Sequence, residues 1–399
     1  MQLLIANLGS TSFKSKLFDM SSDTPRVPIA SGAADRIGQG NSAWEVRVGD
    51  RELEGTADLA DHGAAIDAIL AGINELGVDT SSGIAGVGFK AVHGGPISGA
   101  VVVDDGVLDT MEQFSDVAPA HNPPYIAAMR AIAEKWPDTP QVAAFETAFH
   151  QTIPLSRQVY GVPYEWTQAG VRRYGFHGAS HRYIGERVGE VMPEAKRVIS
   201  CHLGGSCSVC AIDAGKSVYH SMGMTPQTGV FHTNRVGDFD TFALLKLLPM
   251  HDGDLDTVFR RLGKEGGLLG ISGVSADMRD VEEAAANGND RAQLALDAFV
   301  ESVRTQVGAC LMALGGVDAI VFTAGIGQFG KGVREGVCRD LAFAGVELDA
   351  SLNDQATGRD EQRLDAGGTA AAVWVLPTDE EWVVARQTQD VLQSQTANA

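Results

Sequence analysis

The sequence is poor in basic residues and contains no long apolar run. Its 399 residues include 31 Lys and Arg against 51 Asp and Glu, which gives a formal net charge of −20 at pH 7. Nucleic acids and anionic membranes attract basic surfaces, so we expect neither as a partner. No stretch approaches the roughly 18 apolar residues that cross a membrane. These arguments do not extend to a small anionic ligand, which responds to local charge.

Cysteine is also scarce. The five cysteines are an odd number that does not predict a disulfide framework, so we expect a reducing cytoplasm. Cys207 and Cys210 form a C-x-x-C pair, but they lie in an alternating apolar run and no second pair accompanies them. We interpret them as small strand residues, not as a redox or zinc pair. The mostly apolar start at residues 1–5 is too short for a signal peptide and lacks a basic beginning, so no signal peptide is expected.

What the sequence does contain is a repeated pattern of strand, glycine turn and strand. Residues 3–20 predict one such hairpin and residues 197–212 another, about 200 residues further on. This repetition predicts a duplicated α/β fold. We place an N-terminal domain at 1–150, joined by a C-terminal helix at 379–399, and a C-terminal domain at 151–378. Residues 31–63 predict only short pieces of strand.

Three glycine-rich turns that follow predicted strands suit a nucleotide phosphate. They are the segments 7–14, 202–206 and 323–327. Small residues in a tight turn direct backbone N–H groups and hydroxyls toward one point, and Lys14 lies on the strand face opposite to Phe13. The P-loop spacing is absent. Taken alone, the first turn is more typical of an ordinary hairpin. The occurrence of three such turns after strands is what favours a nucleotide phosphate site.

Several polar residues lie at predicted strand ends or in loops. Glu146 ends a buried strand, where α/β active sites place carboxylates, but such a residue also caps turns. Arg235 suits a clamp on a phosphoryl group, although a lone loop arginine is more often on the surface. His177 and His181 lack the glutamate of a zincin, so we interpret them as hydrogen-bond donors to an anion or as packed loop residues. Glu380 suits magnesium or a helix cap.

Taken in order, the motifs resemble those of the acetate kinase family, within the superfamily of acetate and sugar kinases, Hsp70 and actin. The matching segments run from Asn7 to Glu380 and cover nearly the whole chain. They are N-L-G-S-T-S-F-K at 7–14, V-H-G-G at 92–95, A-P-A-H-N-P-P at 118–124, F-E-T-A-F-H-Q-T-I-P at 145–154, Y-G-F-H-G-A-S-H at 174–181, C-H-L-G at 201–204, T-A-G-I-G at 323–327 and P-T-D-E-E at 377–381.

The resemblance implies two duplicated actin-like domains of the ribonuclease H-like α/β type, with an interdomain active-site cleft and usually a homodimer. It implies reversible, in-line transfer of a phosphoryl group between ATP and acetate, or another short-chain carboxylate such as propionate, giving acyl phosphate and ADP. Magnesium is the implied cofactor, and ATP is a co-substrate.

The matching positions also imply residue roles. The implied catalytic residues are Glu146, His177 and Arg235. The implied carboxylate-binding residues are Lys90, Val92, His121, Phe176 and Pro226. The implied magnesium-binding residues are Asn7 and Glu380. The implied nucleotide-binding residues are Ser10, Ser12, Lys14, His202, Leu203, Gly204, Gly205, Ser206, Asp277, Met278, Arg279, Gly325, Ile326, Gly327 and Gln328.

The chain departs from the family pattern within this site. Lys90 stands where the family has an arginine and lacks its bidentate fork, while Glu146 replaces an aspartate; one hypothesis is that the two compensate as a pair. Ala120 replaces a leucine of the acyl pocket and leaves room for a longer substrate. Each methylene bound in an apolar pocket contributes roughly 1 kcal/mol or more, so we expect propionate or butyrate to compete with acetate. Gly205 and Gln328 also depart, which leaves open another phosphoryl donor such as pyrophosphate, or a non-catalytic nucleotide-binding protein.

Overall fold

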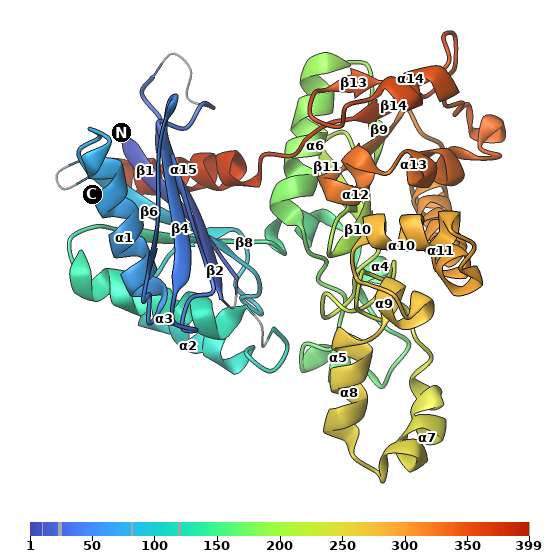
Figure 1. Cartoon of the computed structure of the whole chain (residues 1–399), viewed down its shortest axis with the longest axis horizontal. Coiled ribbons are helices and arrows are strands. Elements are labelled where there is room, and N and C mark those ends of the chain that lie inside the picture. The colour runs from blue at the N-terminus through green and yellow to red at the C-terminus, as the bar shows by residue number, and fades with distance from the viewer. Residues whose placement is uncertain (10, 23–25, 81–82, 119–120, 399) are drawn as a thin grey trace. The chain divides into compact units, whose positions relative to one another are not determined.

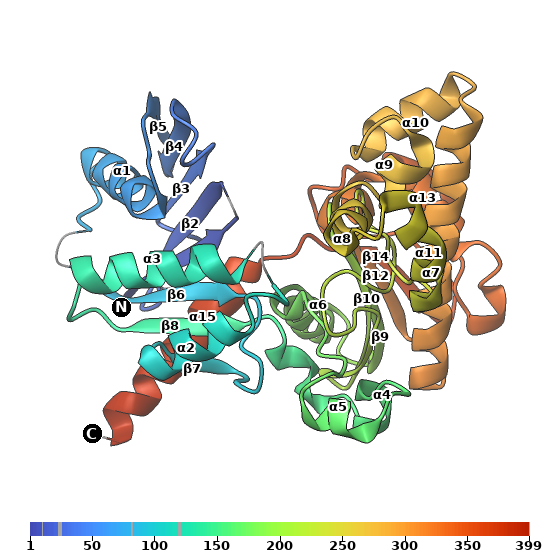
Figure 2. The same cartoon turned by 90° about the horizontal axis from the view of Figure 1, so that it is seen from below.

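A computed structural model describes residues 1–9, 11–22, 26–80, 83–118 and 121–398, with side chains as far as residue 395. The chain divides into two compact units, Met1–Ala148 with Asp379–Ala399, and Phe149–Thr378. Each unit is built around one mixed β-sheet (Figure 1; Figure 2). Within the described ranges, no helix is both long and apolar enough to span a membrane. The predicted site residue Ser10 and the departure at Ala120 lie outside the described residues.

The first unit contains an eight-stranded sheet in the order β5-β4-β3-β2-β1-β6-β8-β7. Its strands are β1 (Gln2–Leu8), β2 (Ser12–Asp19), β3 (Ala30–Asp35), β4 (Ser42–Val48), β5 (Arg51–Ala57), β6 (Ile84–Ala91), β7 (Ala100–Val102) and β8 (Gln141–Phe145). The polar stretch at 31–63, for which only short strand pieces were predicted, contains the regular strands β3 to β5. Antiparallel strands need only one buried face, so their sequences are weakly apolar.

Helices cover both faces of this sheet. α1 (His62–Glu75) and α3 (Asn122–Lys135) pack on the face that includes Leu4 and Ala6 of β1, and α2 (Asp105–Gln113) packs against α3. α15 (Glu380–Asn398) packs on the opposite face, where Leu3 and Ile5 point. Figure 1 shows α15, in red, beside the blue β1. Because successive strand side chains alternate, β1 is buried on both faces.

The second unit contains a six-stranded sheet in the order β11-β10-β9-β12-β14-β13. Its strands are β9 (Arg197–Leu203), β10 (Cys207–Asp213), β11 (Lys216–His220), β12 (Ala319–Thr323), β13 (Gln362–Arg363) and β14 (Ala372–Val375). The run β3-β2-β1-β6-β8 of the first sheet and the run β11-β10-β9-β12-β14 of the second have the same sequence of antiparallel and parallel pairings. This correspondence agrees with the predicted duplication.

The helices of the second unit are α4 (Leu155–Gln158), α5 (Tyr164–Gln168), α6 (Gly178–Val191), α7 (Leu244–Leu247), α8 (Leu255–Lys264), α9 (Gly267–Ser272), α10 (Met278–Ala286), α11 (Asp290–Leu314), α12 (Ala324–Phe329), α13 (Lys331–Cys338) and α14 (Ala350–Gln355). α11 packs with the apolar residues of β9 and β10, while α6 packs against β9. Cys207 and Cys210 are three residues apart in β10 and therefore point to opposite faces, both buried, as expected for small strand residues.

One local prediction is wrong. The third glycine-rich segment is not an open turn, because residues Ala324–Phe329 form the short helix α12 directly after β12. Ala324 alone has a positive φ, of 62°, and redirects the chain there, whereas Gly325 and Gly327 do not have positive φ. A Cβ atom at Gly325 would meet nothing within 4 Å, and one at Gly327 would lie at an ordinary contact distance of 3.5 Å from the Cys201 carbonyl of β9.

Candidate functional site

Two polar clusters contain most of the predicted site residues, one in each unit. The first lies in the first unit, on the sheet face that α15 covers. Gly86 and Gly88 of β6 point toward α15, and a Cβ atom at Gly88 would lie 2.3 Å from Thr388 Oγ1. The alternation of β6 then directs the next side chain on this face, Lys90, toward Glu380 at the start of α15. The two glycines let the helix lie close to the strand.

Lys90 forms an ion pair with Glu380, and both side chains are mostly buried, at 16% and 12% exposure. Burial by itself would lower the pKa of the Lys90 ammonium group. Glu380 and then Glu146 instead raise that pKa, so Lys90 remains charged. The hypothesis that Lys90 and Glu146 compensate as a pair stays a prediction. The ion pair that Lys90 forms in the structure is with Glu380.

Asn7 lies on the same sheet face, near the end of β1. Its Nδ2 donates to Glu381 Oε1 at 3.2 Å. Lys16 Nζ lies 2.9 Å from Asp379 Oδ1 and 3.3 Å from Glu381 Oε2. Although burial opposes the change, Lys16 and Lys90 lower the pKa of Glu381. The start of α15 is thus a row of carboxylates held by two lysines and an amide.

Tyr125 of α3 supports the end of β1 from the interior. Its hydroxyl accepts a hydrogen bond from the backbone N–H of Leu8 at 2.9 Å and lies 3.5 Å from Asn7 Oδ1, to which it can donate. The ring is almost fully buried, and burial raises the pKa of the hydroxyl, so it stays protonated. Tyr125 therefore positions the backbone of Leu8 and the side chain of Asn7, just before the turn between β1 and β2.

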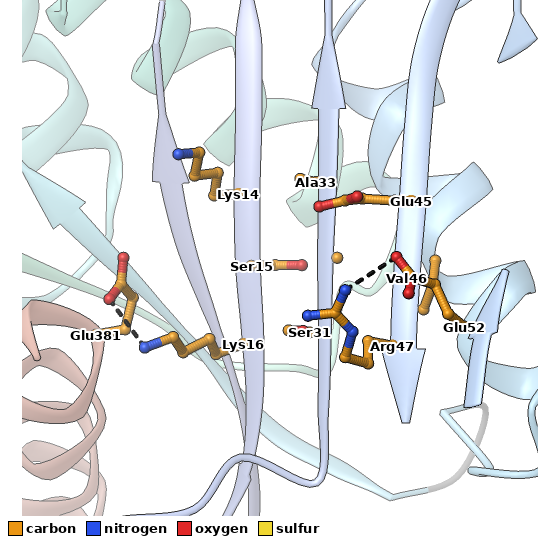
Figure 3. A pocket seen from close by; sticks show the side chains of 11 residues that line it. Lys14, Ser15, Lys16, Ser31, Ala33, Glu45, Val46, Arg47, Glu52 and Glu381 are labelled. Atoms are coloured by element: carbon orange, nitrogen blue, oxygen red, sulfur yellow. Dashed lines mark hydrogen bonds and ion pairs between the residues drawn. The ribbon is translucent and has the colours of Figure 1, made fainter. Parts of the chain in front are cut away.

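Lys14 is exposed and lies on the same face of β2 as Lys16, as the alternation with buried Phe13 predicted. Both lysines line a cavity of about 220 Å³. Figure 3 shows the two lysines, with Glu381 paired to Lys16. The cavity lining also includes Arg47, which pairs with Glu52 (Figure 3), and Glu45. Its charges are balanced in sign. Ser12 begins β2, and its carbonyl accepts from Gly9 N at 2.8 Å, which closes the predicted turn.

The chemistry of the donors at this end of the sheet fits magnesium. Asn7 and Glu380, with Glu381 beside them, offer amide and carboxylate oxygens, which Mg²⁺ prefers. In the part of the chain that the structure describes, no three His, Cys, Asp or Glu side chains gather as a metal cluster. Magnesium does not need one, because it usually binds one or two protein oxygens together with water and phosphate.

The second cluster lies in the second unit, around the turn between β9 and β10. Arg235 Nη1 donates to Ser206 Oγ at 3.2 Å and to the Pro226 carbonyl at 3.1 Å. Thr233 Oγ1 donates to the Gly205 carbonyl at 3.0 Å. Burial lowers the pKa of the Arg235 guanidinium group. The predicted residues Gly205, Ser206, Pro226 and Arg235 are therefore brought together.

His177 directly precedes α6, with a φ of 55° in the left-handed region. Its ring stacks on His202 with centroids 4.0 Å apart. Its Nδ1 lies 2.8 Å from Ser208 Oγ in β10. The preceding residue, Phe176, is buried, and its carbonyl accepts from His150 Nε2 at 2.8 Å. A non-glycine residue at positive φ is costly, so the packing of these rings fixes an unusual backbone at His177.

The remaining predicted residues lie on other elements. Asp277 caps α10 and pairs with Arg279, which is 86% exposed. Gly325, Ile326, Gly327 and Gln328 belong to α12, while Met278 begins α10 and Leu203 ends β9. A Cβ atom at Gly204 would lie 3.4 Å from that of Ala324, so the β9–β10 turn and α12 are neighbours. In the first unit, Val92 follows β6 and His121 precedes α3.

Sequence reasoning missed several residues that support these clusters. Lys16 was detectable, because it lies two residues after Lys14 on the same strand face. Arg334 is fully buried and donates to the carbonyls of Gly327 and Gln328 at 3.0 and 2.6 Å. Nothing in the local pattern distinguishes Arg334 or Tyr125 from ordinary helix residues, since their roles arise from tertiary contacts.

Comparison with known proteins identifies the family. Residues 2–386 match the acetokinase family. The chain is 42% identical over 402 residues to an acetate kinase from Clostridium botulinum, covering 98% of this chain and 99% of the relative. An acetate kinase from Shouchella clausii is 40% identical over 393 residues, covering 97% and 98%.

Solved structures extend the likeness to three dimensions. The crystal structure of Porphyromonas gingivalis acetate kinase matches with a TM-score of 0.89 and 34% identity, covering 98% of this chain and 99% of that one. A propionate kinase from Francisella tularensis matches with a TM-score of 0.89 and 30% identity, with the same coverage. These matches confirm the predicted actin-like α/β fold, and the chain belongs to the acetokinase family.

Proposed function

We propose that the protein is an acetate kinase, which transfers a phosphoryl group reversibly between ATP and acetate or another short-chain carboxylate. The observation that carries this proposal is a set of positioned polar side chains in a chain that matches the family over residues 2–386. Lys90 is mostly buried and ion-paired, His177 stacks on His202 of β9, and Arg235 contacts Ser206 in the turn after β9. Relatives named acetate kinase and a structural neighbour named propionate kinase support the substrate class.

Lys90 binds the substrate carboxylate in this proposal. Held charged by Glu380 and Glu146, it offers a point charge in place of a bidentate guanidinium. The proposed acyl-binding residues are Val92, His121, Phe176 and Pro226. A carboxylate oxygen forms a bond to the γ-phosphorus while the bond from that phosphorus to the β,γ-bridging oxygen breaks, which yields acyl phosphate and ADP.

Arg235 and His177 donate hydrogen bonds to the oxygens of the transferring phosphoryl group, where negative charge accumulates. The contacts of Arg235 with Ser206 and Pro226 fix the guanidinium before substrate binds. Asn7 and Glu380 are the proposed holders of Mg²⁺, which when bound neutralises charge on the phosphates. The proposed nucleotide contacts are Ser12, Lys14, residues 202–206, residues 277–279 and residues 325–328.

A hydroxamate assay for acyl phosphate tests this function with purified protein. Acetate, propionate and butyrate are each offered with ATP and magnesium, and matched reactions contain pyrophosphate in place of ATP. We expect acyl phosphate with ATP, and propionate competing well with acetate. Product only with pyrophosphate would overturn the ATP assignment, and no product with either donor would overturn the kinase assignment.

We also propose that the protein is a homodimer of the cytoplasm. Apolar side chains in the 239–260 region of the second unit are strongly exposed, including Phe242, Leu245 and Met250 at 80%, 73% and 66%. Such a patch suits a second copy of the chain. Sedimentation should give twice the mass of one chain, and Phe242→Asp should give monomers. The five buried, unpaired thiols suit a reducing compartment.

A further inference from the structure

A chain of hydrogen bonds runs from His177 into the interior of the second unit. Ser208 Oγ lies 2.8 Å from His177 Nδ1 and 2.8 Å from His181 Nε2. His181 Nδ1 in turn lies 2.8 Å from Ser200 Oγ. Ser200, Ser208 and His181 are completely buried, on β9, β10 and α6 respectively. These four side chains form a continuous relay.

The position of each proton in the relay follows from its buried end. Ser200 Oγ has no second hydrogen-bond partner among the residues that the structure describes, so its proton finds an acceptor only at His181 Nδ1. A neutral His181 then carries its own proton on Nε2 and donates to Ser208 Oγ. Burial, together with nearby histidines, lowers the pKa of His181 well below its usual value, so the ring is neutral.

Ser208 transmits this order to His177. Its oxygen already accepts from His181, so its single proton is donated to His177 Nδ1. A neutral His177 must therefore carry its proton on Nε2. The opposite order would place the His181 proton on Nδ1 and leave the hydroxyl proton of Ser200 buried without an acceptor, which is unfavourable.

We propose that Ser208, His181 and Ser200 are positioning residues that hold His177 in the Nε2–H tautomer, so that its outer nitrogen is a fixed hydrogen-bond donor. The proposal rests on the proposed function only in one respect, which is the identity of the group that accepts the hydrogen bond from His177 Nε2–H. In the proposed function that acceptor is an oxygen of the transferring phosphoryl group. No proton is transferred in net; the relay sets an orientation, and any reversal would require all four side chains to change together.

Long-range ¹H–¹⁵N spectra of the full-length protein with labelled histidine measure the tautomer directly. The His177 signals are assigned by their loss in His177→Gln. We expect the Nε2–H pattern in the native protein and mixed tautomers in Ser208→Ala and Ser200→Ala. The matched control is Ser217→Ala, which removes the same kind of contact, 2.9 Å from His150 Nδ1, outside the relay. An Nδ1–H pattern in the native protein would overturn the proposal.

Kinetics separate positioning from a merely structural role. In Ser208→Ala we expect kcat to fall about 10-fold while KM for ATP and acetate changes less than about twofold, because only the transition state needs the fixed donor. Ser217→Ala should keep native kcat. If Ser208→Ala retains both the native tautomer and native kcat, the relay has no positioning role. If the native protein forms no acyl phosphate, the proposed function fails, while the spectra still decide the tautomer.

Discussion

The ammonium group of Lys90 in β6 forms an ion pair with the carboxylate of Glu380, the first residue of α15, although 290 positions separate them in sequence. The pair fixes the beginning of α15 against the sheet at the end where Asn7 and Glu381 also meet. Because both side chains are mostly buried, removing either one leaves the other charge in the interior without its ion-pair partner.

We therefore expect Lys90→Met and Glu380→Gln each to lower the free energy of unfolding by about 2–4 kcal/mol. The loss in the double variant should be smaller than the sum of the two single losses by at least about 1 kcal/mol. Urea unfolding measures all four proteins of this cycle. The exposed pair Arg47–Glu52 is the control, with a coupling below about 1 kcal/mol. A larger coupling of Lys90 with Glu146 than with Glu380 would contradict this assignment.

Restoring the family arginine should not improve the enzyme. In Lys90→Arg a larger, planar cation must fit a buried position whose charge is already balanced by Glu380 and Glu146. We expect kcat/KM for acetate to stay at or below the native value, because the surrounding carboxylates are arranged for a point charge. The hydroxamate assay measures it, and a gain of about 10-fold would show that Lys90 is simply a weaker substitute.

The contacts of Tyr125 predict a second effect at the same end of the sheet. Tyr125→Phe removes the acceptor for the buried N–H of Leu8 and the neighbour of Asn7 Oδ1. We expect a loss of about 1–3 kcal/mol in unfolding free energy, with a raised KM for magnesium–ATP. Tyr164→Phe, at a residue 67% exposed, is the matched control. Unchanged stability in Tyr125→Phe would mean that Leu8 finds another partner.

Much of this fold could be predicted from the sequence because its signals are local. Strand alternation and small turn residues predict the hairpins around Gly9 and Gly204. Apolar residues at helical spacing predict α11. The strands β3 to β5 and the helix α12 were less visible. Their sequences are polar or glycine-rich, and packing against neighbouring elements, not local preference, decides their conformation.

The candidate site was partly predictable for the same reason. Motifs identified Asn7, His177 and Arg235, which the structure embeds in polar contacts. The partner of Lys90 could not be predicted, because it depends on how α15 lies along Gly86 and Gly88. The interpretation of the histidines as packed loop residues is half right for His181, which is buried but lies in helix α6. Its place between two serines depends on three-dimensional contacts.

Arg235 should not tolerate lysine. Its guanidinium already uses one nitrogen on Ser206 and Pro226, which leaves the rest of the fork for substrate, and an ammonium group cannot serve both. We expect Arg235→Lys to lower kcat by about 10²–10³-fold with an unchanged circular dichroism spectrum. Arg261→Lys, at a surface arginine paired with Glu265, should have native kcat. Native turnover in Arg235→Lys would remove Arg235 from the proposed chemistry.

Buried histidines predict how stability depends on pH. Burial lowers the pKa of His150 to about 4 and of His232 to about 3, and those of His181 and His220 well below the usual 6.5. Above about pH 6.5 these rings are neutral in both the folded and unfolded states, so they add no pH dependence. As the pH falls below that value, only the unfolded chain takes up protons. Stability is therefore lost on acidification, by up to about 1.4 kcal/mol per pH unit for each histidine.

Urea unfolding between about pH 7 and pH 5 measures this slope. His150→Gln, which keeps a donor for the Phe176 carbonyl, should make the slope shallower by about one proton. The comparison isolates one ring, because the carboxylates of the chain are the same in both proteins. An equal slope in the variant and the native protein would mean that His150 is protonated in the folded state, against its burial between His181 and His220.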